Sequence, residues 1–457
     1  MRSLLWLAVL LAGFGLMLFS YWHFQRIADP NPWTEAFMYV GKGKPAGDVS
    51  QLPCEAAQVR HLPPGKIWSE ILREVEQADP RAAAQLKFAL REKVVRLPGF
   101  REDFTPEMLA SGRLPRPGTD EILAGGETAH RGALDAWGTH FTVVGVLDRS
   151  VALLGRAYVV PGDAVSKAPF EDRSDEVYSA YILRMDRREA LQLEMRKRLA
   201  AAFPPRQFRV EAGIVRVGPG SYGLYLAGMA LLFLGGSALF MRVYEGLARV
   251  IPVAWLRAPF EAARDGKALL GGLHALLFGT IILLSAVAYL VPPFQILPLM
   301  AVNQTMSEGS GPLGVAAQAY VSGSIPRAAV VTLIINFFLG SLAYITAPSV
   351  VIPGVGVWLT WLRAVLIGFL MAPTMLQLST IMLPHSFTVL VEMEAYVLAA
   401  FFAALIPVYL FDTSKGPGVW RRYGRALLLN LKAYAVILAL LTIAAIYEAT
   451  EVILMMR

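Results

Sequence analysis

Charge and cysteine are both scarce in this sequence. Only 17% of its 457 residues are charged, against about 25% in an average soluble domain, and the mean hydropathy is +0.49. This composition excludes an ordinary water-soluble globule, and its hydrophobicity excludes a disordered chain. The single cysteine, Cys54, cannot form an intramolecular disulfide, which excludes a disulfide-stapled scaffold. What remains is a polytopic membrane protein with a large polar insert.

Motifs of common catalytic sites are also missing. There is no GxxxxGK[ST] phosphate loop, because residues 41–47 (GKGKPAG) lack its spacing and its flanking strand and helix, and there is no HExxH, GxSxG or CxxC. We therefore expect no enzyme, no cofactor, no metal site and no ATP hydrolysis by this chain. The run EGSG at residues 308–311 is similar to an intramembrane serine-protease site. An enzyme that depends on Ser310 or His385 is the least favoured alternative.

Long apolar stretches dominate the sequence. A membrane-spanning helix needs roughly 20 apolar residues, and seven stretches qualify, at about 4–22, 217–241, 269–291, 328–344, 355–383, 395–411 and 427–447. Prolines separate the third, fourth and fifth stretches, and Pro373 is expected to kink the fifth. We interpret the first stretch as an uncleaved anchor, with a cleaved signal peptide as the alternative. The expected fold class is a polytopic α-helical membrane protein with about seven transmembrane helices.

Basic residues cluster in two loops, and this predicts the orientation. Residues 242–267 contain five Lys or Arg, residues 412–426 contain four, and residues 292–326 contain none. Short basic loops stay in the cytoplasm, so the N-terminus should be cytoplasmic and residues 25–216 extracytoplasmic. The expected location is a bacterial inner membrane, with multiple crossings. Loop anchoring accounts for the net charge of +7, and no basic stripe with aromatics indicates nucleic-acid binding.

The chain divides into three expected parts. Residues 1–24 form an N-terminal transmembrane anchor, residues 25–216 an extracytoplasmic α+β domain, and residues 217–457 a six-helix bundle with cytoplasmic loops near 242–267 and 412–426. Within the domain, apolar spacing predicts helices and β-branched runs predict strands. The expected helices cover 66–77, 81–95 and 187–202, and the expected strands cover 121–123, 140–148, 156–162 and 178–184.

Three segments of the insert carry a family resemblance. GRLPRPGTDEILAG, WGTHFTVVGVLDR and RAYVVPGDA follow one another between about residues 112 and 163. In order and spacing they resemble the periplasmic core domain of MacB/FtsX-type ABC permeases. That resemblance implies a permease that works with a separate cytoplasmic ATPase and passes mechanical motion to the outside.

The region from about residue 328 to 410 is similar to a second family, the stage II sporulation protein M family. Its matching positions are Asn336 and Gly340, then Gly354 and Gly356, then Pro384, His385 and Glu392 or Glu394. The sequence departs from the family at the histidine, because Glu392 follows His385 by seven residues instead of about one helical turn. Two residues two turns apart on one face do not touch without a bridging group.

Several polar residues fall inside the apolar stretches. Such residues are costly in a bilayer and tend to face a bundle interior or a water-filled cavity. Our intramembrane polar candidates are Asn336, Arg363, His385, Glu392 and Glu394. We expect a polar relay or a partner-recognition site in which Arg363 faces Glu392 or Glu394. For Lys432, Glu448 and Glu451 we expect snorkelling towards the helix ends.

Residues 244–264 (YEGLARVIPVAWLRAPFEAAR) mix arginines with large apolar side chains. An amphipathic helix of this kind lies along a membrane surface or docks a cytoplasmic partner, in the manner of a permease coupling helix. Our partner-docking candidates are Tyr244, Arg249, Trp255, Arg257 and Phe260.

These observations favour a permease-like membrane subunit of an ABC-type transport or mechanotransmission complex. Its expected partners are a cytoplasmic ATPase subunit, envelope or periplasmic proteins and the lipid bilayer; self-association stays open. The alternative is a non-transporting scaffold that assembles cell-envelope or peptidoglycan-remodelling proteins, as the second resemblance implies.

Overall fold

The computed structural model describes residues 2–27, 33, 36–47, 49, 52–62, 73, 76–77, 92–126, 128, 132–148, 150–166, 170, 177–184, 193–204, 207–212, 217–291, 294–295, 298–299, 301–302, 305, 309, 311–374 and 376–456. The chain forms two compact units. Residues 1–26 and 216–457 form a helical bundle, and residues 27–215 form the insert. The two units are described separately below.

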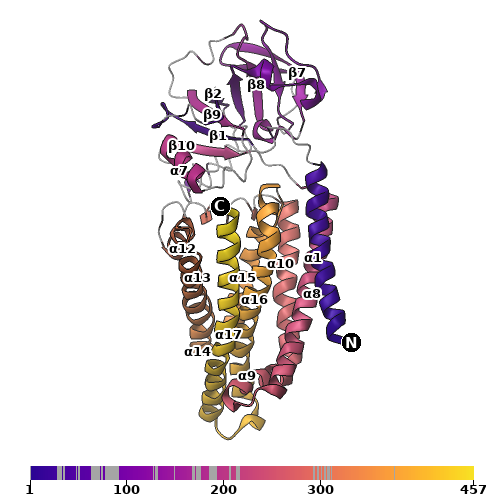
Figure 1. Ribbon diagram of the computed structural model, residues 1–457, viewed down its shortest axis with the longest axis vertical. Coiled ribbons are helices and arrows are strands. Elements are labelled where there is room, and N and C mark those ends of the chain that lie inside the picture. The colour runs from indigo at the N-terminus through magenta and orange to yellow at the C-terminus, as the bar shows by residue number, and fades with distance from the viewer. Residues whose placement is uncertain are drawn as a thin grey trace. The chain divides into compact units, whose positions relative to one another are not determined.

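The bundle is almost entirely helical (Figure 1). Its main helices are α1 (Arg2–Ile27), α8 (Pro219–Val250), α9 (Ala254–Asp265), α10 (Lys267–Leu290), α12 (Gly311–Val321), α13 (Ile325–Ile334), α14 (Ala347–Val351), α15 (Val355–Leu370), α16 (Leu376–Phe411) and α17 (Val419–Met456). A π-helix, η3 (Ile335–Thr346), joins α13 to α14, and a 3-10 turn, η4 (Thr413–Lys415), joins α16 to α17. Twelve residues of π-helix are unusual, since this geometry normally occurs as single turns, often at functional sites.

Six helical segments of the described chain are long and apolar enough to cross a membrane. They are Ser3–His23, Pro219–Val250, Lys267–Leu290, Ile325–Val351, Met382–Phe411 and Val419–Met455. The remaining apolar helix, α15, has 16 residues. This confirms a polytopic helical membrane protein at the coarse level, with six segments of full length where the sequence predicted about seven.

The predicted fifth span, residues 355–383, is wrong as one continuous helix. α15 ends at Leu370 and α16 begins at Leu376, so the chain breaks around Pro373 instead of kinking there. The break exposes backbone carbonyls that must find donors. The Gln295 side chain donates to the Ala372 carbonyl at 2.5 Å, and the Val217 amide donates to the Thr374 carbonyl at 2.9 Å.

Helices α1 and α8 pack closely because glycines remove side chains from their interface. A Cβ on Gly13 would lie 2.6 Å from the Gly228 carbonyl oxygen, and a Cβ on Gly235 would lie 2.6 Å from the Leu10 amide nitrogen. Small residues allow such approach between membrane helices. The Ser20 hydroxyl also donates to the Ser221 carbonyl at 2.5 Å. The first helix is therefore an integral part of the bundle.

Within the bundle, two ends can be distinguished (Figure 1). The N-terminal end of α1, helix α9 and the α16–α17 turn lie at one end, which we call the α9 end. The C-terminal end of α1 and the start of α8 lie at the other, as does the end of α17. Both connections to the insert therefore leave the bundle from the same end.

The insert contains a ten-stranded mixed sheet with the order β10-β1-β9-β2-β3-β8-β5-β7-β4, and β6 pairs with β7. The strands are β1 (Phe37–Gly41), β2 (Cys54–His61), β3 (Lys93–Leu97), β4 (Leu109–Gly112), β5 (Glu121–Ala124), β6 (Ala133–Ala136), β7 (Thr139–Leu147), β8 (Ala157–Pro161), β9 (Val177–Leu183) and β10 (Phe208–Ala212). The four predicted strands are confirmed as β5, β7, β8 and β9. The short helices are α4 (Phe100–Asp103) and α7 (Leu193–Ala202), with 3-10 turns at Pro106–Met108 and Ala152–Leu154.

The helix predicted over residues 81–95 is wrong at its C-terminal end. Residues Lys93–Leu97 form β3, which pairs antiparallel with β2 and parallel with β8. Val94 and Val95 are both completely buried, one on each face of the sheet. A short apolar run has no decisive periodicity, so tertiary pairing decided its structure. The rest of that segment, 81–91, and most of 66–77 lie outside the described residues.

The two strands nearest the bundle in sequence are neighbours in the sheet. β1 is the first strand after α1 and β10 the last before α8, and they pair antiparallel with Tyr39 opposite Val210. β10 is an edge strand. The chain therefore enters the sheet at Phe37 and leaves it at Ala212, two residues that are paired with each other.

Candidate functional site

Glu394 on α16 is the centre of a buried polar group in the bundle. The Tyr244 hydroxyl of α8 donates to its Oε1 at 2.7 Å, and Nε2 of His274 on α10 lies 2.7 Å from its Oε2. Nδ1 of His274 lies 2.8 Å from the Leu270 carbonyl oxygen. Glu394 is fully buried, and Tyr244 and His274 are 3% and 4% exposed. We call these three residues the Glu394 centre; it links α8, α10 and α16.

The sequence analysis selected two members of this centre and missed the third. Glu394 was an intramembrane candidate and Tyr244 a docking candidate, but His274 was not considered. The signal was present, because His274 is the one histidine within the apolar stretch at 269–291, and an ionisable residue in a span is a candidate by default.

A second polar group lies around His385 on α16. Its Nδ1 is 3.6 Å from Oε1 of Glu451 on α17, and the Thr388 hydroxyl donates to Oε2 of Glu451 at 3.4 Å. Glu448, one turn earlier on α17, acts electrostatically on His385 and on Tyr320 of α12. The Tyr320 hydroxyl also lies 2.9 Å from the Thr332 hydroxyl.

Snorkelling of Glu448 and Glu451 is therefore not observed. Glu451 is only 9% exposed and faces His385, and Glu448 is half-buried. As expected, no direct hydrogen bond joins His385 to Glu392 among the described residues; His385 pairs with a carboxylate of another helix instead. The Lys432 side chain is half-buried, so it is not fully exposed at the surface of the bundle.

Arg363 on α15 does not pair directly with either glutamate. Its guanidinium lies over the Tyr396 ring, 4.0 Å from the centroid, and its Nη1 donates to the Gly340 carbonyl at 3.2 Å. The Tyr396 hydroxyl donates to Glu392 at 2.9 Å. The predicted link from Arg363 to Glu392 therefore passes through Tyr396, and the link to Glu394 is wrong because Glu394 contacts His274 and Tyr244.

Gly340 makes room for this arrangement within the π-helix. A Cβ there would lie 2.8 Å from Nη1 of Arg363 and 2.9 Å from the Tyr396 hydroxyl. Asn336, one turn earlier, is half-buried and is not part of the contacts just described. We call the polar residues around Glu392 the Glu392 network. In it, three carboxylates act on one guanidinium and one imidazole. Its members are Arg363, Tyr396, Glu392, Glu448, His385 and Glu451.

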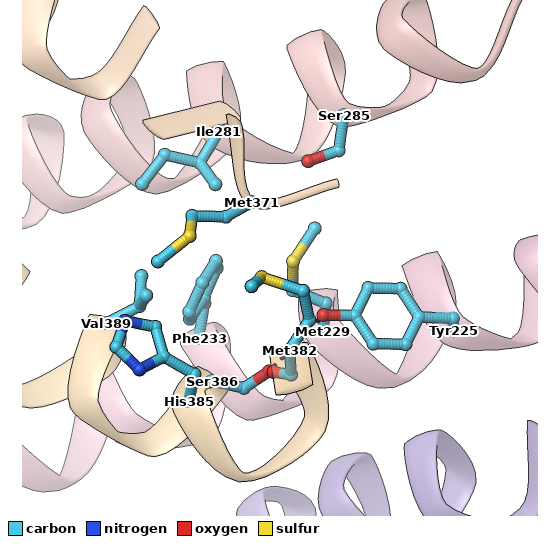
Figure 2. Close-up of a pocket in the computed structure, with 10 residues that line it drawn as sticks. All are labelled: Tyr225, Met229, Phe233, Ile281, Ser285, Met371, Met382, His385, Ser386 and Val389. Carbon is cyan, nitrogen blue, oxygen red and sulfur yellow. Dashed lines mark hydrogen bonds between the residues drawn. The ribbon is translucent and has the colours of Figure 1, made fainter. Parts of the chain in front are cut away.

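A small cavity adjoins His385 between α8, α10, α15 and α16 (Figure 2). Met229, Met371 and Met382 surround it, and the Tyr225 hydroxyl lies 3.2 Å from the Ser386 hydroxyl at its edge. With thioethers, three hydroxyls and an imidazole, the lining suits a water molecule.

The docking candidates separate into exposed and buried residues. Arg249 is exposed and Trp255 is 50% exposed, while Arg257 is half-buried and pairs with Glu261 at 3.0 Å. Tyr244 and Phe260 are buried, with their rings 5.9 Å apart. These two residues therefore attach α9 to the bundle and cannot themselves contact a partner.

Two exposed hydrophobic residues extend the surface next to Trp255. Val250 is 77% exposed and Val253 is 45% exposed, at the corner between α8 and α9. Together with Trp255 we call these exposed apolar residues of the corner the α9 patch; Arg249, which precedes Val250, is also exposed.

Two charged clusters organise the insert. Arg184, directly after β9, pairs with Glu55 at 2.5 Å and with Asp103, and Glu55 also accepts from the Gly99 amide at 3.0 Å. Burial, together with the neighbouring Asp103 carboxyl, raises the pKa of Glu55. In the segment that carries the first resemblance, Arg113 pairs with Glu121 at 2.5 Å and lowers the pKa of Glu121 to about 2.

No group of three or more His, Cys, Asp or Glu side chains that could hold a metal ion occurs in the described residues. Cys54 is a free, half-buried thiol whose pKa is raised by burial. Ser310 lies outside the described residues.

Comparison with protein-family models gives no match, and comparisons with curated proteins and with solved structures give no significant match either. The two family resemblances in the sequence therefore remain predictions.

Proposed function

We propose that this chain is the permease-like membrane subunit of an ABC-type complex, and that it transmits motion between a separate cytoplasmic ATPase and its own extracytoplasmic domain. In this proposal the protein lies in a bacterial inner membrane and α15 completes a set of seven crossings. The α9 end faces the cytoplasm, because its loops hold nine Lys and Arg at residues 242–267 and 412–426.

The observation that carries the proposal is the continuity of α8. This single helix of 32 residues extends over about 48 Å, from the corner with α9 to the connection that leads into β10. Because an α-helix is stiff along its axis, a displacement at the corner with α9 would be carried along α8 to its other end, where the chain continues to β10.

Helix α1 reinforces this path. It packs on α8 through Gly13, Gly228 and Gly235, and its own connection leads to β1, the strand paired with β10. The chain thus continues from two packed helices, α1 and α8, to two paired strands, β1 and β10. In this proposal a motion of the helix pair is transmitted to that strand pair.

The α9 patch is the surface on which we place the ATPase. α9 is held from behind by Phe260 and Ala263, which are buried, while Trp255, Val250 and Val253 remain exposed. An exposed apolar patch on a helix that is fixed to the bundle suits a partner protein that pushes on that helix. A helix that only lies in the membrane surface does not need to be attached to the bundle in this way.

The test is quantitative co-purification of the full-length chain in mild detergent, followed by mass spectrometry. We expect a stoichiometric nucleotide-binding subunit with ATPase activity, and Trp255→Glu should reduce its recovery at least about tenfold, which corresponds to about 1.4 kcal/mol. The matched control is Trp420→Glu, since Trp420 is 84% exposed on α17 at the same end of the bundle.

Two results would overturn the proposal. One is the absence of any ATPase from the wild-type complex. The other is recovery of envelope or peptidoglycan-remodelling proteins that Trp255→Glu leaves unchanged, which would establish the scaffold instead.

A further inference from the structure

The hydrogen bonds of the Glu394 centre fix how many protons it holds. A backbone carbonyl can only accept, so Nδ1 of His274, 2.8 Å from the Leu270 oxygen, carries a hydrogen. Nε2 of the same ring lies 2.7 Å from Oε2 of Glu394. Two lone pairs do not approach to that distance, and therefore one further proton lies between the imidazole and the carboxyl group.

With this proton, His274 and Glu394 are together electrically neutral. The proton resides on the carboxyl group beside a neutral imidazole, or on the imidazole beside a carboxylate, and the sum of charges is the same. Without it, a full negative charge would remain on Glu394, which is completely buried. An uncompensated charge in a low-dielectric interior is strongly unfavourable.

The centre is held together by direct contacts with one carboxyl group. Glu394 is the ionisable group within hydrogen-bond distance of both Tyr244 and His274. Helix α9 contributes an uncharged group, the ring of Phe260, whose centroid lies 5.9 Å from that of the Tyr244 ring. The titratable groups joined by these hydrogen bonds are Tyr244, His274 and Glu394.

We propose that the Glu394 centre is an exchangeable proton-binding site that holds the α8–α9 corner against α10 and α16. When the proton is bound, Tyr244 donates to a neutral pair and keeps Phe260 and α9 in place. When the proton leaves, the buried negative charge of Glu394 faces the lone pair of His274 Nε2. This repulsion weakens the junction of the three helices. This inference does not depend on which partner docks at α9.

The experiment uses the full-length chain in lipid nanodiscs, from about pH 5 to about pH 10. Two quantities are measured at each pH: the thermal unfolding midpoint, and hydrogen exchange of the α9 peptide corrected for intrinsic rates. Glu394→Gln is the informative variant, because glutamine can donate to His274 and accept from Tyr244 but has no proton to lose. The matched control is Glu245→Gln, next to Tyr244 on α8, where Glu245 pairs with Arg242 at 2.9 Å.

We expect the wild type and Glu245→Gln to show an alkaline transition with a lower midpoint and faster exchange in α9. Glu394→Gln should remove that transition and be the more stable protein at the alkaline end. A wild type with no transition overturns the proposal, and so does a Glu394→Gln protein that keeps it, since the group would then be only a structural hydrogen bond.

If Glu394→Gln does not fold, His274→Gln gives the same decision. Removing the imidazole leaves one proton acceptor in place of two, so the transition should move to lower pH. An unchanged transition in His274→Gln would contradict a proton shared by the two residues.

Discussion

Glu392 and Glu394 are two residues apart on α16 and belong to different networks. Two residues correspond to about 200° around an α-helix, so their side chains leave on opposite sides. Glu392 accepts from Tyr396 and is grouped with Arg363 and His385, whereas Glu394 contacts His274 and Tyr244. One helix thereby organises polar contacts with α15 and α17 on one side and with α8 and α10 on the other.

The first prediction concerns the space at Gly340. Gly340→Ala would place a methyl group 2.8 Å from the Arg363 guanidinium, so we expect Arg363 to leave the Tyr396 ring and the bundle to lose about 2 kcal/mol. The measurement is the unfolding free energy in mixed micelles. Gly246→Ala in α8 is the control, because a Cβ there meets open space; a loss equal to the control's would show that Arg363 does not need this position.

The second prediction concerns the packing of α1 on α8. Gly13→Ala would bring a Cβ to 2.4 Å from the Leu232 amide nitrogen, which is backbone and cannot move aside. We expect α1 to separate from α8 and the unfolding midpoint of the bundle to fall by several degrees, equivalent to about 1–3 kcal/mol. Gly15→Ala on the same helix has nothing nearby and should match the wild type. Equal effects of the two changes would contradict close packing at Gly13.

The third prediction is a pH dependence in the insert. Because burial and Asp103 raise the pKa of Glu55 in the folded state, the protonated form stabilises the fold. This stabilisation is fully present below about pH 4.5, the ordinary value, and is lost as the pH rises through the raised folded pKa. Glu55→Gln mimics the protonated form, so its advantage over the wild type should grow with pH.

The neighbouring Cys54 is a local reporter for this effect. Its thiol is half-buried in β2, so its labelling rate measures the opening of that strand. The ratio of the wild-type rate to the Glu55→Gln rate should rise with pH above about 4.5. Glu107→Gln, at an exposed glutamate, is the control and should follow the wild type at every pH. A ratio that is constant with pH would mean that Glu55 titrates normally.

The fourth prediction concerns orientation in the membrane. In a Cys54→Ser background, a cysteine at Arg421 should be labelled by a membrane-impermeant reagent only after the cells are opened, since the α9 end should be cytoplasmic. Thr119 lies in the insert, where its exposed hydroxyl donates to the Arg116 carbonyl. A cysteine at position 119 should be labelled in spheroplasts without lysis. Labelling of position 421 from outside would reverse the proposed topology.

The β pattern of the insert was accessible from the sequence because it is local. HFTVVGVLD and RAYVVPG contain alternating or continuous β-branched residues between turn signals, and they form β7 and β8. KVVRL has a similar composition, but its first three residues fall within the helix predicted over residues 81–95. Only its position between β2 and β8 distinguished the two possibilities.

The sequence by itself determined where the chain is apolar for long enough to be a membrane helix, because hydropathy and length are properties of consecutive residues. It also indicated which polar residues would be costly in a bilayer. The tertiary structure alone decided which of them meet: His274 with Glu394 across 120 positions, His385 with Glu451, and Arg363 with Tyr396. Helix rotation and the break at Pro373 set these pairs, and both depend on how neighbouring helices pack rather than on any local pattern.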